Sequence, residues 1–350
     1  MENLLEKYLV KTARINNVRD YVVIPTIEEI QDVFKVDDYD ERIAYPTDYA
    51  VMKGVEQFGD DTGMTRYWLD RNNSSASYVC YVNKCGYILS SYYPTTYYFG
   101  VRPALKLNLK SVISAQSAAS EFFKINSNKK TIEFGLYPQD YVLPKDEELY
   151  SQHSKYGTFK LKMKKFDDYA RYENGFYAPD SGTPVCALIK PIEWVITNWE
   201  DLPTSINPDG SGEAQTIDLI SEKVLFPMAF SSGSTYWENS KIRAYLNGYV
   251  LEKGSANNEN FITQAILPYL AEVENSINAS KSVAESGSYT KKINELKIDL
   301  ISKISSPEIG ERELARVLSD YSKALETLYY NKAAAENQLR YNSQEPEMGE

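Results

Sequence analysis

The sequence holds one histidine and three cysteines among its 350 residues. Structural zinc sites take four Cys or His ligands, and a disulfide framework needs several cysteine pairs. His153 lies in a polar stretch and is predicted to be an exposed loop residue rather than a catalytic base. Cys80 and Cys85 either face each other across a hairpin or stay free, and Cys186 lies in an apolar run typical of a core. These scarcities exclude a zinc domain and a disulfide scaffold.

The chain also lacks an excess of positive charge, since its formal net charge is −11. Proteins that bind nucleic acid cluster Lys and Arg against the phosphates. The one local basic run is KLKMKK at 160–165, which we interpret as the solvated face of a strand. Nucleic acid is therefore not expected as a partner.

Long apolar runs are missing too. No stretch reaches the roughly 18 apolar residues of a membrane-spanning helix. The first 20 residues carry charges every few positions and no apolar core before a cleavage site, so they do not resemble a secretory signal. We expect no membrane span, an amphipathic helix at the N-terminus, and a location in the cytoplasm or in a virus particle.

Tyrosine, in contrast, is abundant in one segment. Eight of the 32 residues from Tyr67 to Tyr98 are tyrosine, and most others are Asn, Ser, Thr or small. Tyrosine offers a rigid amphipathic contact face, and Ser and Asn offer adaptable hydrogen bonds. The composition predicts a surface that binds a protein or a glycan. The expected ligand-binding residues are Asn72, Asn73, Ser75, Tyr78, Tyr81, Asn83, Tyr92, Tyr93, Thr95 and Tyr97.

Strand and helix patterns alternate along the chain. Thr26, with Glu29 three residues on, matches a capping box at the start of a helix. A strand is expected at 131–134, paired strands at 158–163, 185–189 and 192–196, and a helix at 236–249. The expected parts are an N-terminal helix at 1–20, a part with the Tyr-rich hairpin at 21–109, a linker at 110–129 (with a surface helix as the alternative for this stretch), a second α+β part at 130–276, a linker at 277–289, a helical hairpin at 290–341 and a disordered tail at 342–350.

The predicted helical hairpin has one apolar stripe. Ile293, Leu296 and Leu300 recur at helical spacing on its first helix, and Leu314 and Tyr321 on its second. Two helices alone cannot bury such a stripe completely. We expect the hairpin either to fold back on the rest of the chain or to form a homo-oligomer through residues 290–341.

Several short motifs resemble one uncharacterised bacterial and phage domain family. Its members carry Trp-Leu-Arg-Ser followed by Gly-Val-Arg-Pro-Ala-Leu in one half. The other half, which in most of them comes first, carries Phe-Gly-x-Tyr-Pro-Gln, Pro-Ile-x-Trp and a Trp-Glu-x-Ser-x-x-Arg-x-x-Leu-Asn helix. The matching segments here are Tyr67–Leu69, Gly100–Leu105, Phe134–Gln139, Pro191–Trp194 and Trp237–Asn247. Asp70-Arg71 replaces the Arg-Ser of the family, and the two halves stand in the opposite order.

This family is similar to the C-type-lectin-like fold of formylglycine-generating enzymes and of the variable proteins of diversity-generating retroelements. The resemblance implies an α+β fold, namely a C-type-lectin-like mixed domain with a twisted antiparallel sheet, its halves in permuted order, followed by the helical hairpin. Retroelements of this kind scatter Asn codons to Tyr, Ser and Thr, which the composition of the Tyr-rich segment would fit. A fixed tyrosine surface is the alternative.

The residues offer no catalytic constellation, because the chain has no nucleophile elbow and no phosphate-binding glycine loop. We expect no enzyme activity and no cofactor. Trp68, Trp237 and Arg243 are predicted to be structural. Arg102 is predicted to hold the hairpin through buried carbonyls or a carboxylate, with a ligand role as the alternative.

Three functional hypotheses follow. The first is a non-enzymatic recognition protein, such as a phage or prophage surface component, that binds through its Tyr-rich face. The second is a structural virion or assembly protein in which the tyrosines form a subunit interface. The third is an oxidase of the formylglycine-generating type, for which Cys80 and Cys85 would have to bind copper.

Overall fold

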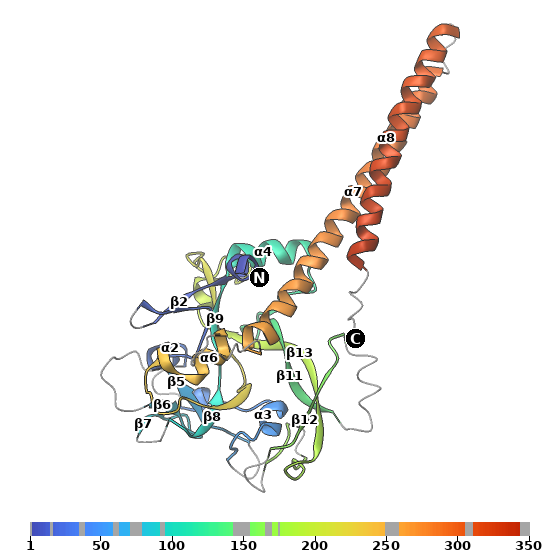
Figure 1. The fold of residues 1–350 in the computed structure, drawn as a ribbon. Coiled ribbons are helices and arrows are strands. Elements are labelled where there is room, and N and C mark those ends of the chain that lie inside the picture. The colour runs from blue at the N-terminus through green and yellow to red at the C-terminus, as the bar shows by residue number, and fades with distance from the viewer. Residues whose placement is uncertain are drawn as a thin grey trace. The chain divides into compact units, whose positions relative to one another are not determined.

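The structure is a computed structural model. It describes residues 2–14, 17–34, 39–58, 63–70, 79–91, 95–142, 155–164, 170–173, 176–248, 259–304 and 311–343. As predicted, the fold is mixed α+β, with antiparallel sheets and a C-terminal helical pair (Figure 1). The chain forms two units, which we call the body (Met1–Gln116 and Ser120–Leu270) and the hairpin unit (Ser117–Ala119 and Ala271–Glu350).

The larger sheet of the body joins both halves of the sequence. Its strand order is β1-β9-β14-β13-β11-β10, with β12 also on β13 and β4 also on β9, and every pair is antiparallel. These strands are β1 (Leu9–Val10), β4 (Val22–Val23), β9 (Ala104–Asn108), β10 (Ile125–Asn126), β11 (Thr131–Val142), β12 (Thr158–Lys162), β13 (Pro184–Ile196) and β14 (Thr216–Ser221). Because β9 pairs with β14, the expected parts 21–109 and 130–276 are not separate.

A second sheet of five strands also crosses that expected boundary. Its order is β15-β8-β5-β6-β7, and β5 and β8 form its one parallel pair. The strands are β5 (Tyr67–Leu69), β6 (Val79–Val82), β7 (Ile88–Ser91), β8 (Tyr98–Val101) and β15 (Phe226–Ala229), while β2 (Thr12–Ala13) and β3 (Arg19–Asp20) pair separately. Since β8 and β9 are consecutive, the segment around Arg102 passes from one sheet to the other.

Short helices complete the body. They are α1 (Glu2–Tyr8), α2 (Ile27–Val33), η2 (Asp40–Arg42), α3 (Asp48–Met52), α4 (Leu109–Ala118), η4 (Trp199–Asp201), η5 (Trp237–Asn239), α6 (Lys241–Asn247) and η6 (Ile262–Ile266). The capping box predicted at α2 is confirmed, because Thr26 Oγ1 accepts from the Glu29 N–H and the Glu29 carboxylate accepts from the Thr26 N–H. A side chain that satisfies the first free N–H groups fixes where a helix begins.

An aromatic cluster fills the core beside the larger sheet. The Phe123 and Phe134 rings stack with centroids 5.6 Å apart, and Tyr269 meets Phe134 edge-on at 5.3 Å. Trp194 Nε1 donates to the Phe134 carbonyl. The bulge in β11 falls next to this cluster at Gly135, whose φ is +74°. The stretch 110–129 thus forms α4, β10 and core aromatics, so a helix, the alternative expected there, is confirmed and the linker is wrong.

Two further boundaries differ from expectation. The N-terminal 20 residues contain α1 but continue as short strands, so they are not one helix. The strands expected at 185–189 and 192–196 form one strand, β13. Pro191 lies between the stretch of β13 that pairs with β12 and the stretch that pairs with β14, and it is opposite Leu136 at the irregular point of β11. A proline is tolerated in a strand where its nitrogen faces no ladder.

The hairpin unit consists of α7 (Leu267–Ile304, which begins in the body) and α8 (Glu311–Ser343), which run side by side in Figure 1. The linker expected at 277–289 is wrong, because α7 continues through it. That segment contains no proline. The hydroxyl of Ser282 bonds back to the carbonyl four residues earlier, and so does that of Thr290, which directly follows the segment. Serine and threonine therefore satisfy their own polar groups within the helix instead of ending it.

The two helices pair through a heptad pattern. Lys303 Nζ lies 3.0 Å from the Tyr321 hydroxyl, and Ser286 lies near Glu336, so the pair is antiparallel. Partly or fully buried residues recur at alternating steps of three and four, which is the spacing of a coiled-coil seam. They are Ser282, Ser286, Tyr289, Ile293, Leu296 and Leu300 on α7, and Leu314, Val317, Tyr321, Ala324, Leu328, Asn331 and Ala335 on α8.

Candidate functional site

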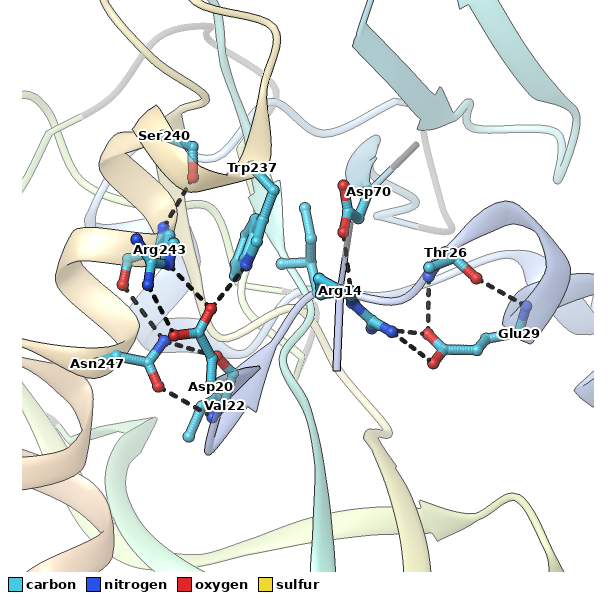
Figure 2. Close-up of polar contacts among 11 residues, drawn as sticks. Arg14, Asp20, Val22, Thr26, Glu29, Asp70, Trp237, Ser240, Arg243 and Asn247 are labelled. Carbon is cyan, nitrogen blue, oxygen red and sulfur yellow. Dashed lines mark hydrogen bonds and ion pairs between the residues drawn. The ribbon is translucent and has the colours of Figure 1, made fainter. Parts of the chain in front are cut away.

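Two of the residues expected to be structural meet on one buried carboxylate, that of Asp20 at the end of β3 (Figure 2). Trp237 Nε1 donates to Asp20 Oδ2 at 2.8 Å, and Arg243 donates through Nε to Oδ2 at 2.9 Å and through Nη2 to Oδ1 at 3.1 Å. Asn247, one turn further along α6, bonds both the N–H and the carbonyl of Val22. The helix motif thus fastens α6 to the N-terminal strands.

A second ionic cluster in Figure 2 connects α2 with Arg14, just after β2, and with Asp70, just after β5 of the five-stranded sheet. Arg14 donates to both carboxylate oxygens of Glu29, at 2.9 and 3.0 Å, and its Nε lies 3.3 Å from Asp70 Oδ2. Only 6% of either side chain in the Arg14–Asp70 pair is exposed. Asp70 therefore belongs to a buried ion pair.

Trp68 also lies in the core. Its side chain is fully buried, its Nε1 donates to the Met228 carbonyl at 2.8 Å, and its ring lies 4.4 Å from that of Phe99. Trp68, Trp237 and Arg243 therefore have structural contacts, and none of the three presents an exposed face to a ligand.

Exposed tyrosines gather at one end of the five-stranded sheet. One row of paired residues crosses the neighbouring strands β8, β5, β6 and β7. It consists of Gly100, Tyr67, Val82 and Ile88. The start of β8 and the turn from β6 to β7 therefore lie on the same side of that row. The exposed fractions there are 47% for Tyr87, 49% for Tyr97 and 50% for Tyr98.

Tyr39 joins the same end from a distant segment. It is 41% exposed, and its ring centroid lies 4.6 Å from that of Tyr87. Gly86 makes this approach possible, because a Cβ at Gly86 would lie 1.8 Å from the Tyr39 carbonyl oxygen. We name Tyr39, Tyr87, Tyr97 and Tyr98 the tyrosine surface. Sequence reasoning missed Tyr39, since nothing in the chain brings it next to the hairpin before folding.

Cationic side chains lie over rings at this end of the sheet. Lys164 Nζ is 4.8 Å from the Tyr98 centroid, and Lys84 Nζ is 5.1 Å from that of Phe58. A cation over a ring is attracted by the ring quadrupole and holds it in one orientation. The surface therefore combines rigid aromatic faces with positive charge.

The expected ligand-binding residues have different positions. Tyr97 belongs to the tyrosine surface, but Tyr81 and Thr95 are only 3% and 8% exposed, so a direct contact with a macromolecule is wrong for both. The Tyr81 ring packs on Phe99 at 5.0 Å, because all four residues of β6 face the core. Asn83 Oδ1 accepts from the N–H groups of Cys85 and Tyr87 and shapes the turn. Outside the described residues lie Asn72, Asn73, Ser75, Tyr78, Tyr92 and Tyr93.

The cysteines are all free, with Cys80 and Cys186 buried and Cys85 exposed. Cys80 pairs with Ser90 across the hairpin, while Cys85 lies in the turn, so the two thiols are not opposite each other. Within the described ranges no group of three or more His, Cys, Asp or Glu is placed to hold a metal ion. His153 falls outside those ranges.

A cavity of about 490 Å³ opens beside Arg102. Phe34, Ile43 and Tyr45 form an apolar part of its wall, and charged residues form the rest. Arg102 is 3% exposed and donates through Nε to the Ser221 carbonyl at 2.6 Å. Its guanidinium also lies over the rings of Phe34 and Tyr67, at 5.1 and 5.4 Å.

Two glutamates at the cavity have different partners. Burial raises the pKa of Glu222, and a hydrogen bond and the negative charge of Glu193 raise it further. Two carboxyls that share a hydrogen bond cannot both ionise easily. Glu173, another lining residue, is instead paired with Lys223 at 2.6 Å.

Comparison with known proteins gave no match to a family model, to a curated protein or to a solved structure. In the part of the chain that the structure describes, no helix is both long and apolar enough to span a membrane.

Proposed function

We propose that this protein is a non-enzymatic recognition protein that binds a protein or glycan through the tyrosine surface. The observation that supports this most is the grouping of four half-exposed tyrosines at one end of a sheet. Exposed aromatics of this kind contribute most of the binding energy in many interfaces, because they bury large areas at small entropic cost.

The surroundings support the same function. Tyr39 and Tyr87 contact each other, and a cation covers Tyr98, so these rings are held in position before any ligand arrives. A surface that is ordered beforehand loses less conformational entropy on binding. Glycans and proteins both use such platforms, because aromatic faces stack on sugar rings and on apolar side chains.

In the same proposal the body has a C-type-lectin-like fold with its halves in permuted order. Both halves contribute strands to both sheets, as a permuted single domain requires. A retroelement-diversified segment is a weaker extension of the proposal, since Tyr81 and Thr95 are core residues that tolerate little change.

The hairpin unit is proposed to join two copies. Ile298 and Ile301 on α7 are 68% and 60% exposed, and Leu318 on α8 is 46% exposed. These side chains lie outside the seam between α7 and α8, so a single hairpin leaves them exposed, and a second hairpin presents the same apolar side chains. Two such hairpins form a four-helix bundle, a common way to bury apolar side chains that one helical pair leaves exposed.

The assembly hypothesis remains the alternative, with the tyrosine surface as a subunit interface. A glycan or cell-binding assay separates the two. If a monomer binds a glycan or a cell and Tyr97→Ala abolishes that binding, recognition is supported. If the wild type is an oligomer and Tyr97→Ala dissociates it, assembly is supported. Copper binding that Cys80→Ser removes would instead favour the oxidase.

A further inference from the structure

Arg102 carries a buried charge without a counter-ion. Among the described residues, no carboxylate forms a salt bridge with its guanidinium, although 97% of the residue is shielded from solvent. Its contacts are the Ser221 carbonyl, the Tyr67 hydroxyl at the long distance of 3.5 Å, and two ring faces. Two other arginines of the body with largely buried side chains, Arg14 and Arg243, each pair with an aspartate.

A charge in this environment is costly. A buried ion loses its hydration, and the loss is offset only when a counter-ion and hydrogen bonds replace the water. Arginine has five N–H donors in a planar fork, and only two of them have partners here. The donors without a protein partner belong to a side chain that lines the 490 Å³ cavity.

Three glutamates line the cavity. The Glu173 carboxylate pairs with Lys223, and the Glu222 carboxyl shares a hydrogen bond with Glu193. The third, Glu41, is exposed and forms no salt bridge with Arg102 in the described part of the chain. None of the three therefore neutralises Arg102, and space remains for an external anion. The fork geometry of a guanidinium matches the two oxygens of a carboxylate.

We propose that this cavity binds a small organic carboxylate. The carboxylate accepts hydrogen bonds from the Nη groups of Arg102, and the apolar body of the ligand packs against Phe34, Ile43 and Tyr45. The volume suits a molecule of the size of an amino acid or a short peptide end. This site is separate from the tyrosine surface, so it would exist whether or not the proposed recognition function is correct.

The test uses phenylacetate and its neutral isostere phenylacetamide, with acetate and L-phenylalanine as further probes. Binding is followed by ligand-observed NMR and by the Nε–Hε signal of Arg102 in the full-length chain. We expect phenylacetate to bind about tenfold or more tighter than phenylacetamide, since a hydrogen bond to a charged group is lost in the amide. Tighter binding of L-phenylalanine would add an ammonium contact with the cavity glutamates and also support the site.

Two variants locate the binding. Arg102→Lys keeps the charge but loses the fork, and it should abolish the preference for the carboxylate. Because that residue also holds Ser221, a folded control is needed, and Ile43→Trp fills the cavity without touching the guanidinium. Ile43→Trp should weaken phenylacetate binding at least tenfold, whereas the same change at exposed Ile301 should leave it unaltered.

The proposal is wrong if none of the carboxylates moves the Arg102 signal. Equal binding of phenylacetate and phenylacetamide would also overturn it, and so would phenylacetate binding that survives Ile43→Trp.

Discussion

Asp20 and Arg243 form a buried bidentate ion pair between a strand near the N-terminus and helix α6, 223 positions apart in the sequence. The Asp20 side chain is fully buried, and that of Arg243 is 17% exposed. With Trp237 on the same carboxylate, this pair connects the first and last parts of the body.

Arg243→Ala should destabilise the body by about 3–5 kcal/mol, because it leaves the Asp20 carboxylate buried without its partner. Chemical denaturation monitored by tryptophan fluorescence measures this change. The matched control is Lys190→Ala, which breaks an exposed pair with Asp140 and should cost less than about 1 kcal/mol. Equal costs for the two variants would contradict the structural role of Asp20.

Gly86→Ala should perturb the tyrosine surface. The residue has a φ of +77°, and the added methyl group would meet the Tyr39 carbonyl at 1.8 Å. The control is Gly182→Ala, where φ is +89° but nothing lies within 4 Å of the new Cβ. The control measures backbone strain alone, about 1 kcal/mol.

We expect Gly86→Ala to lower the melting temperature more than its control. It should also increase the exposure of Tyr39, which selective tyrosine iodination with mass spectrometry detects. Similar melting temperatures for the two variants would mean that Tyr39 does not pack on the turn.

Glu222 should make stability depend on pH. Its pKa is raised in the folded protein, so the folded state holds the proton more tightly than the unfolded chain. The resulting stabilisation is fully present below the ordinary glutamate pKa and is lost as the pH rises through the raised value.

Glu222→Gln removes this titration and retains a hydrogen-bond donor toward Glu193. The variant should therefore melt higher than the wild type at neutral pH and similarly at low pH. Melting temperatures of the wild type and of Glu222→Gln, measured at several pH values from acidic to neutral, test this. A difference that stays constant with pH would contradict the shared proton.

Replacement of both Ile298 and Ile301 by Gln should favour the monomer. These side chains are exposed on one stretch of α7, and the change removes the apolar area that a second hairpin would cover. Sedimentation velocity measures the oligomeric state. Lys291→Gln is the control, because Lys291 is exposed on the same helix. A wild-type protein that is monomeric at all concentrations would rule out the proposed pairing.

Local features of the fold could be predicted from the sequence, since neighbouring residues determine them. The capping box at Thr26 and Glu29 needs only one helical turn, and the C-terminal helices follow from the spacing of apolar residues such as Ile293 and Leu300. The linker at 277–289 is wrong because a composition rich in Ser and Ala does not show heptad spacing, whereas the heptad positions of Ser282 and Ser286 let them face α8 as small seam residues.

Long-range pairing could not be predicted in the same way. Nothing near Gly100–Leu105 shows that β8 and β9 take β15 and β14 as partners, and this pairing merges two expected parts into one body. Burial of Tyr81 likewise depends on Phe99, which belongs to another strand. The composition of the hairpin predicted a tyrosine face, but the register decides which tyrosines lie on it.

The most direct test of the account is a glycan array and cell-binding screen with the wild type and with a Tyr87→Ala, Tyr97→Ala double variant. Tyr236→Ala is the control, since that residue is 43% exposed and lies outside the tyrosine surface. The account predicts that the double variant loses about thirtyfold or more in affinity for the wild-type ligand, as expected when interface hot spots are truncated, while the control keeps it. Unchanged affinity in the double variant would contradict recognition through the tyrosine surface.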